Sequence, residues 1–158
     1  MKALIISDSH GVRNTFLDII NLEKPDRVFF LGDNISDARF VKKNAKVKID
    51  CVKGNLDYDV NGKNDLVLNF LNKKILLTHG HKYNVKRSFY KLFLRAKELN
   101  VDYVFYGHTH KYKKFEKDKI TFINPGSIAK PRGQKNGSYV IINYKENKLS
   151  FLKKELTI

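Results

Sequence analysis

Eight polar side chains, which occur in short motifs, are the best candidates for chemistry in this chain of 158 residues. They include all five histidines, and their motifs read Asp-Ser-His, Gly-Asp, Gly-Asn, His-Gly-His and His-Thr-His. A loop can direct both members of an i, i+2 pair to one place, so the pattern predicts one site rather than scattered structural histidines. The eight side chains are Asp8, His10, Asp33, Asn55, His79, His81, His108 and His110.

The types of these side chains indicate a transition-metal site. Imidazole nitrogen combined with carboxylate and amide oxygen suits Mn, Fe, Ni, Co or Zn better than Mg or Ca, which prefer oxygen ligands alone. The single cysteine, Cys51, lies outside the motifs, so a closed structural zinc site is not expected. Even seven of these eight side chains are too many for one ion, but seven fit two ions about 3.5–4 Å apart if one carboxylate bridges the ions. Such a pair activates a shared water and holds a phosphoryl group during in-line displacement.

Each motif follows a stretch of sequence that predicts a β-strand. In open α/β sheets, ligands bind outside the carboxyl ends of the strands, so the candidate side chains are expected to converge on one rim. The predicted strands that end just before the motifs are residues 2–7, 27–31, 47–51, 75–78 and 101–106.

The remaining pattern indicates an α/β fold with two sheets. The first 55 residues read β-α-β-α-β, which is typical of parallel strands joined by crossover helices. Helices are predicted from Asn14 to Glu23, from Ser36 onward and over 85–99, the last with an apolar stripe that faces the core. Asn124-Pro125-Gly126-Ser127 predicts a tight turn. We expect one domain over 1–158, with further strands at 66–71, 112–116, 120–123, 138–144 and 149–155.

The composition narrows the class of protein. A hydrophobic content of 42%, with 11 Phe and 8 Tyr, supplies a core, and one cysteine excludes an internal disulfide framework. No run approaches the roughly 18–20 apolar residues of a membrane span. The apolar N-terminal run is also shorter than the ~7–15 residues of a signal-peptide core. We therefore expect a cytoplasmic protein with no membrane partner.

The net charge of +15 leaves two interpretations open. Of the 31 basic residues, 25 are Lys and six are Arg, and they are scattered along the chain without a run of five or six. This pattern is typical of a lysine-rich surface, whereas groove reading and bidentate phosphate recognition favour Arg. The alternative is a positive field that steers an anionic substrate or a nucleic acid.

The motifs, in this order, resemble those of the calcineurin-like metallophosphoesterases. The resemblance covers residues 8–127, and the Asn-Pro-Gly-Ser turn resembles one in the compact bacterial and archaeal branch of that family, which includes small single-domain phosphodiesterases. It implies an α-β-β-α sandwich of two mixed sheets with helices on the outer faces. The matching motifs are Asp8-x-His10, Gly32-Asp33, Gly54-Asn55, Thr78-His79-Gly80-His81 and Gly107-His108-Thr109-His110.

The resemblance also implies a division of labour among the side chains. Asp8, His10 and His110 would hold one metal ion, and Asp33 would bridge it to a second. A hydroxide that bridges both ions would be the nucleophile. The second ion would be held by Asn55, His79 and His108.

Two of the candidates are expected to act on the substrate. Asn55 would touch a substrate oxygen in addition to its metal, and His81 would either contact the phosphate or orient its loop. The expected enzyme is a phosphodiesterase with two divalent ions, Mn favoured over Ni, Co, Fe or Zn, acting on a small phosphate ester. A non-catalytic metal-binding scaffold of the same fold, a nuclease and a homo-oligomer are left open.

One residue departs from the family pattern. Many members carry a histidine directly after the asparagine, where it can protonate the leaving group, but this chain has Leu56 there. Leucine cannot donate a proton, and general acid catalysis contributes typically 10²–10⁴-fold. We therefore expect better turnover of activated substrates and diesters than of alkyl phosphomonoesters.

Overall fold

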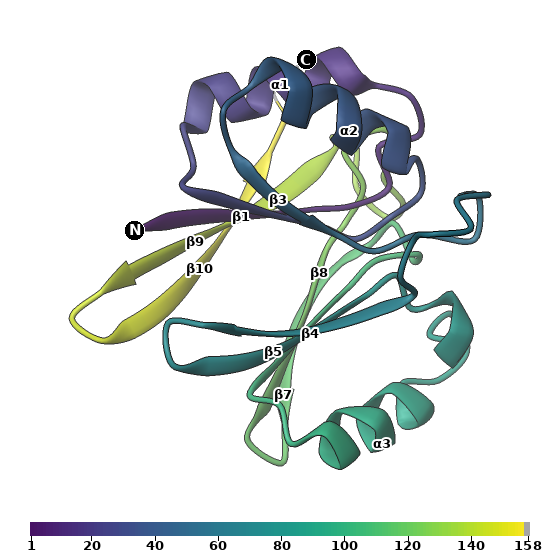
Figure 1. Ribbon diagram of the computed structural model, residues 1–158. Helices are drawn as coiled ribbons and strands as arrows, with labels where there is room; N and C mark the ends of the chain where they lie inside the picture. The colour runs from purple at the N-terminus through teal and green to yellow at the C-terminus, as the bar shows by residue number, and fades with distance from the viewer. Residues whose placement is uncertain (157–158) are drawn as a thin grey trace.

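The structure is a computed structural model that describes residues 1–156. Two five-stranded sheets form its centre (Figure 1). The last two residues of the expected 1–158 domain lie outside the described part. In the first sheet the strand order is β10-β9-β1-β2-β3; β1, β2 and β3 run parallel, and β9 is antiparallel to both of its neighbours, β1 and β10. Its strands are β1 (Lys2–Ile6), β2 (Arg27–Phe30), β3 (Lys48–Cys51), β9 (Ser138–Lys145) and β10 (Lys148–Glu155).

The second sheet is also mixed. Its order is β4-β5-β6-β8-β7; the three central strands run parallel and both edge strands are antiparallel to their neighbours. Because parallel strands end at the same edge, β5 and β6 carry their following loops to one rim. The strands are β4 (Asp65–Phe70), β5 (Lys73–Thr78), β6 (Tyr103–Tyr106), β7 (Tyr112–Lys117) and β8 (Ile120–Pro125).

Helices cover the outer face of each sheet. Helices α1 (Arg13–Glu23) and α2 (Ile35–Asn44) cover the first sheet, and α3 (Tyr90–Leu99) covers the second (Figure 1). Among the described residues, each helix is too short or too polar to cross a lipid bilayer. The expected α-β-β-α sandwich with mixed sheets is therefore confirmed.

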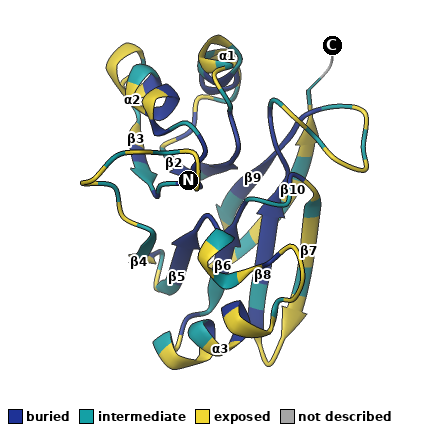
Figure 2. Ribbon diagram, turned by 90° about the vertical axis from the view of Figure 1, so that its right-hand side faces the viewer, coloured by how far each residue is buried: buried dark blue, intermediate teal, exposed yellow. Residues whose placement is uncertain are grey.

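Alternation along the strands produces three apolar layers. In β1, Leu4 and Ile6 pack against α1 and α2, whereas Ala3 and Ile5 point the other way into the space between the sheets. The third layer joins the second sheet to α3. Figure 2 shows the central strands buried and the outer surfaces of the helices exposed. These layers fix both sheets, so that the loops at the rim have a rigid support.

The predicted helix over 85–99 is shorter in the structure, and this prediction was wrong at its start. A short 3-10 helix, η1 (His81–Tyr83), is followed by a turn, and α3 begins only at Tyr90. The Ser88 side chain accepts a hydrogen bond from the Tyr90 N–H at 3.1 Å, which offers the backbone a turn instead of a continued helix. The predicted turn at Asn124 is also displaced, since Asn124 and Pro125 are the last residues of β8.

Candidate metal centre

The predicted convergence at the strand ends is present in the structure. Asp8 follows β1, Asp33 follows β2 and Asn55 follows β3. His79 directly follows β5, and the His108 to His110 segment follows β6. Contacts between loops of different sheets, described below, bring these side chains into two adjoining groups.

The first group contains two carboxylates and two imidazoles. One ligand atom from each of Asp8, His10, Asp33 and His110 lies within 4.8 Å of all the others. The Nε2 atoms of His10 and His110 are 3.2 Å apart, and Nε2 of His110 is 3.1 Å from Oδ1 of Asp8. Four ligand atoms so close together form a cage of the size that a single metal ion needs.

The second group adjoins the first through a carboxylate. Nε2 of His79 lies 3.2 Å from Oδ1 of Asn55 and 3.2 Å from Nδ1 of His108. The same His79 nitrogen is 3.4 Å from Oδ2 of Asp33, which also belongs to the first group. Asp33 thus lies between the two groups, where a bridging ligand would have to be.

A buried oxygen of Asp8 tests whether these residues suit a cation. Its Oδ2 accepts hydrogen bonds from the Ser7 hydroxyl and the His108 N–H, but Oδ1 is buried without a hydrogen-bond partner in residues 1–156. Nitrogens of His10 and His79 each lie 3.9 Å from this oxygen. An unsatisfied buried carboxylate oxygen is costly, and a divalent cation would remove that cost. The donor set therefore fits a metal ion.

Backbone carbonyl groups orient two of the imidazoles. Nδ1 of His79 donates to the Leu31 carbonyl at 2.7 Å, and Nδ1 of His110 donates to the Lys130 carbonyl at 2.8 Å. Each bond fixes the ring and, when the ring is neutral, leaves the lone pair on Nε2, which points into the groups described above. This is the arrangement usual for metal-binding histidines.

The ionisation states also suit cation binding. Burial opposes ionisation of Asp33, but hydrogen bonds from His79 and the Leu56 N–H, together with the charge on His79, lower its pKa to about 2. Burial lowers the pKa of His108 to about 4, and the positive charges of His79 and Lys86 act in the same direction. At neutral pH, Asp33 is therefore an anion and His108 is neutral, which are the forms that bind metal ions. Burial opposes the charged form of His79, but Asp33 and Asp8 raise its pKa, so a cation bound there would displace a proton from this ring.

The candidate ligands share an uncommon backbone conformation. Positive φ is rare for residues other than glycine, but it is least costly for Asp, Asn and His. Such strain persists where the surrounding structure holds it, and it is concentrated at functional sites. The candidate ligands with positive φ are Asp8 (56°), His10 (42°), Asp33 (59°), His108 (69°) and His110 (59°).

Glycine at position 107 allows the two sheets to meet at the site. A Cβ atom there would lie 2.1 Å from the Ser7 hydroxyl oxygen and 2.9 Å from Oδ2 of Asp8. The loop after β6 could not then bring the His108 N–H to that carboxylate. Glycine, which has no Cβ, permits this close backbone approach.

Asp57 supports the site, and sequence reasoning assigned it no role. Its carboxylate accepts backbone N–H bonds from Asp33, Asn34, Ile35 and Gly54 at 2.7–3.0 Å. It therefore caps the start of α2 and ties the loop after β2 to the loop that carries the candidate ligand after β3. The available signal was an acidic residue three positions after the glycine of the Gly-Asn motif.

A second carboxylate holds the loop around His10. Oδ2 of Asp37, in the first turn of α2, accepts hydrogen bonds from the Ser9 hydroxyl at 2.7 Å and the Gly11 N–H at 2.9 Å. These residues flank His10 on both sides. Asp37 thus positions the histidine without pointing at the ligand atoms themselves.

The segment after β8 fastens both halves of the site. Nδ2 of Asn124 donates to the Gly107 carbonyl at 2.8 Å and to the Thr109 hydroxyl at 3.0 Å. The Ser127 hydroxyl donates to the Asp8 carbonyl at 2.8 Å. The Asn-Pro-Gly-Ser motif therefore has a structural task, which is to hold the loops after β1 and β6 together.

His81 lies beside the second group and outside the four-residue cluster. Its ring centre is 5.4 Å from that of His79 and 6.1 Å from that of His108. Its Nδ1 is buried without a hydrogen-bond partner among the described residues, and burial lowers the pKa of its ring. The ring is therefore neutral at neutral pH, and it lies beside the second group with one nitrogen that no described residue satisfies.

The mouth of the site is small and partly apolar. A cavity of about 260 Å³ is lined by His10, Asn34, Leu56 and Lys130. Leu56 is 54% exposed there, at the position where the resemblance would place a proton-donating histidine. The Lys130 ammonium supplies positive charge instead.

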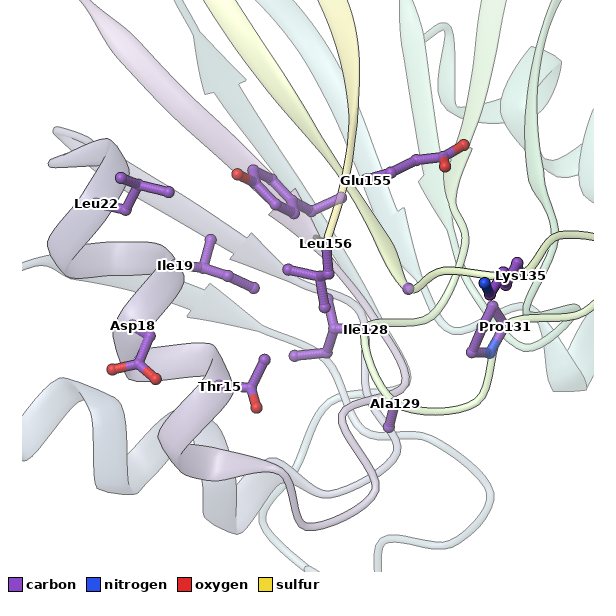
Figure 3. Close-up of a pocket in the computed structure, with 12 residues that line it drawn as sticks. Thr15, Asp18, Ile19, Leu22, Ile128, Ala129, Pro131, Lys135, Glu155 and Leu156 are labelled. Atoms are coloured by element: carbon purple, nitrogen blue, oxygen red, sulfur yellow. The ribbon is translucent and has the colours of Figure 1, made fainter. Parts of the chain in front are cut away.

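A larger cavity, of about 610 Å³, lies elsewhere (Figure 3). It is formed between α1, the segment after β8 and the end of β10, with Ile19, Ile128 and Leu156 along its wall. Asp18, Glu155 and Lys135 are its charged residues, and none of the candidate ligands borders it. Its size therefore says nothing about the chemistry of the metal centre.

Comparison with known proteins agrees with this geometry. Residues 1–147 match the calcineurin-like phosphoesterase superfamily domain. A Bacillus subtilis protein named probable metallophosphoesterase YsnB is 35% identical over 144 residues, which is 90% of this chain and 83% of the relative.

Two solved structures extend the comparison. A Streptococcus pneumoniae protein described as a predicted phosphoesterase is 30% identical, with a TM-score of 0.81 over 98% of this chain and 96% of the other. A protein described as a novel archaeal phosphodiesterase is 26% identical, with a TM-score of 0.78 over 99% of this chain and 100% of the other. With its fold, its clustered metal-binding side chains and this similarity over nearly its whole length, the chain belongs to the calcineurin-like phosphoesterase superfamily.

Proposed function

We propose that this protein is a phosphodiesterase that uses two divalent metal ions, with Mn favoured over Ni, Co, Fe or Zn. The observation that carries the proposal is the buried Oδ1 of Asp8, which lacks a hydrogen-bond partner in residues 1–156 and faces imidazole nitrogens of His10, His79 and His110. The description of one structural neighbour as an archaeal phosphodiesterase supports the choice of diesters.

In this proposal each group of side chains holds one ion. Asp33 contributes to both, because its carboxylate lies in the first group and 3.4 Å from His79 of the second. Asp8, His10 and His110 complete the first group; Asn55, His79 and His108 complete the second.

When bound, the ions supply an activated water and neutralise charge on the phosphoryl oxygens. Hydrolysis would join a water oxygen to phosphorus as the bond to the leaving oxygen breaks; the water would release one proton to solvent, and the leaving group would depart as an anion with the electron pair of that bond. The Asn55 amide and the His81 ring would bind phosphoryl oxygens. The Lys130 ammonium at the mouth attracts the anionic ester.

Leu56 determines which esters react well. Because it offers no proton, a leaving group must depart without general acid help from this position. Aryl diesters, whose leaving groups are stable anions, should therefore be hydrolysed faster than alkyl phosphomonoesters.

The test is hydrolysis of bis(p-nitrophenyl) phosphate and of an alkyl phosphomonoester by protein loaded with Mn, Ni, Co, Zn or Mg. We expect Asp33→Asn to lower kcat/KM on the diester by roughly 10³-fold, because the shared carboxylate serves both ions. Asp118→Asn is the matched control, since Asp118 forms an exposed ion pair with Lys97. Its activity should equal that of the wild type.

Two outcomes would contradict the proposal. Faster hydrolysis of the alkyl monoester than of the diester would exclude the diester assignment. Binding of metal without hydrolysis of either ester, in the wild type and Asp33→Asn alike, would favour a metal-binding scaffold over an enzyme.

A further inference from the structure

A second pocket, of about 470 Å³, lies beside the metal centre on the outer side of the second sheet. Its apolar surface comes from Val85 and Phe89, which precede α3, and from Tyr106 at the end of β6. A volume of this size suits a small organic ligand. The residues of the 85–89 segment that line the pocket precede α3, which begins at Tyr90.

The charge of this pocket is entirely positive. Lys86, Lys111, Lys113 and Arg132 line it, and no carboxylate does. None of the four forms an ion pair within residues 1–156. Lys113 rests its ammonium 4.5 Å from the ring centre of Phe89, which holds the charge at the apolar wall. Four unpaired cations favour an anionic occupant.

Two links join the pocket to the metal centre. Thr109, between two candidate ligands, is part of the lining. The Arg132 N–H donates to the His110 carbonyl at 2.9 Å, so the loop that carries this cation is fastened to a candidate ligand. A molecule bound at the metal centre can therefore extend one arm into the pocket.

We propose that this basic pocket binds a second anionic group of the substrate. The substrate class is then a small phosphodiester in which one ester arm carries a further phosphate or carboxylate, and the apolar wall contacts the body of that arm. This inference rests on the proposed phosphodiesterase function, and it adds the chemical class of the substrate. The pocket's volume favours a small ester over a nucleic-acid strand.

The first test uses two chromogenic diesters that differ by one phosphate. One is the p-nitrophenyl ester of thymidine 5′-phosphate, and the other carries an additional 3′-phosphate. With Mn-loaded wild type, the additional phosphate should raise kcat/KM roughly tenfold, as expected for one added charge-assisted hydrogen bond. The effect should appear in KM rather than in kcat.

Adjacent lysines of β7 provide a matched pair of variants. Lys113 faces the pocket, whereas the Lys114 ammonium lies 5.3 Å from the ring centre of Phe151, on the other face of the strand. Lys113→Gln should lower the ratio of kcat/KM for the two diesters from about ten to near one. Lys114→Gln removes the same charge and should leave the ratio unchanged.

A binding measurement on metal-free protein separates this inference from the proposed function. Calorimetry with thymidine 3′,5′-bisphosphate in the presence of chelator should show binding that Lys113→Gln weakens and Lys114→Gln does not. If this holds but no ester is hydrolysed, the proposed function fails and the anion pocket stands.

Three results would contradict the proposal that this pocket binds an anionic group of the substrate. They are a ratio near one in the wild type, equal effects of the two lysine variants, or tighter binding of single-stranded oligothymidylate that both variants weaken equally. The last result would assign the binding to the general positive field of the chain.

Discussion

The two groups of candidate ligands differ in how deeply the fold holds them. In the first group, Asp8 and His110 are buried, and two carboxylates are present. In the second, His79 is buried but His108 is half-buried and Asn55 is exposed. If each group holds one cation as proposed, we infer from this difference in burial that the first group retains its cation more tightly and that the second stays open to a ligand.

The supporting contacts show the same contrast. Asp8 is held by Ser7, by the His108 N–H and, through its carbonyl, by Ser127. Asn55, by comparison, contacts His79 and otherwise depends on the loop that Asp57 fastens. Substitution of a candidate ligand in the first group should therefore reduce Mn-dependent activity more than substitution of one in the second group.

The largest expected effect is that of Asp8→Asn. The amide keeps the shape of the side chain but removes the charge that faces three imidazoles, so Mn-dependent activity should fall roughly 10³-fold. The metal-free variant should be more stable than the wild type, by about 1 kcal/mol, since an amide NH2 in place of the unpartnered Oδ1 can donate to Nε2 of His110, which lies 3.1 Å from that position. Thermal unfolding with and without Mn measures both changes. A loss of stability in the chelated variant would contradict this interpretation of Oδ1.

Asn55→Ala is the comparison for that variant. Asn55 is exposed, so its loss should leave metal-free stability within about 0.5 kcal/mol of the wild type. Titration of chelated protein with Mn should retain the tighter of two binding events and weaken the other. If both events weakened equally, the contrast between the two groups would be wrong.

The next largest effect is expected for Asp57→Ala. Four backbone N–H groups lose their acceptor, and solvent replaces it only in part, so the free energy of unfolding should fall by about 2–4 kcal/mol. Mn binding at the second group should also weaken, because Asp57 no longer joins the loop that carries Asn55 to the loop after β2. Asp59→Ala is the control, since Asp59 pairs with the exposed Arg39 and should cost less than about 1 kcal/mol. Chemical denaturation of both variants measures the difference.

Asp57 also shows where sequence reasoning stops. The rim was predictable because strand ends are visible as apolar runs before each polar motif, and parallel strands share an edge. The partners of Asp57 were not predictable, because they are backbone N–H groups of loops up to 24 residues away. The late start of α3 has a similar cause: Ser88 captures the Tyr90 N–H locally, and the apolar stripe over 85–99 does not reveal that competition.

The pH dependence of folding stability tests the environment of His108, which belongs to the second group. The pKa of His108 is about 4 in the folded chain and ordinarily 6.5, so between these values the unfolded chain binds the additional proton. This histidine therefore opposes folding progressively as pH falls through 6.5 toward 4, and it has no such effect above 6.5. In chelated protein, His108→Gln should reduce the loss of stability between pH 6.5 and 4. Identical profiles for variant and wild type would show that burial does not depress this pKa.

The smallest expected effect is that of Leu56→His, which tests the open side of the site. Leu56 is 54% exposed beside His10 and Asn34, so the substitution should change stability by less than about 0.5 kcal/mol. A histidine there can protonate a leaving oxygen, but the described residues that surround it pack against a leucine and provide no contact that would orient an imidazole. We therefore expect a gain of about tenfold on an alkyl phosphomonoester, below the full range of general acid catalysis. Bis(p-nitrophenyl) phosphate needs no such proton, so its turnover should not change. An equal gain on both esters would mean that position 56 acts through substrate binding. Leu56, rather than the exposure of Asn55, would then control the access of substrate to the second group.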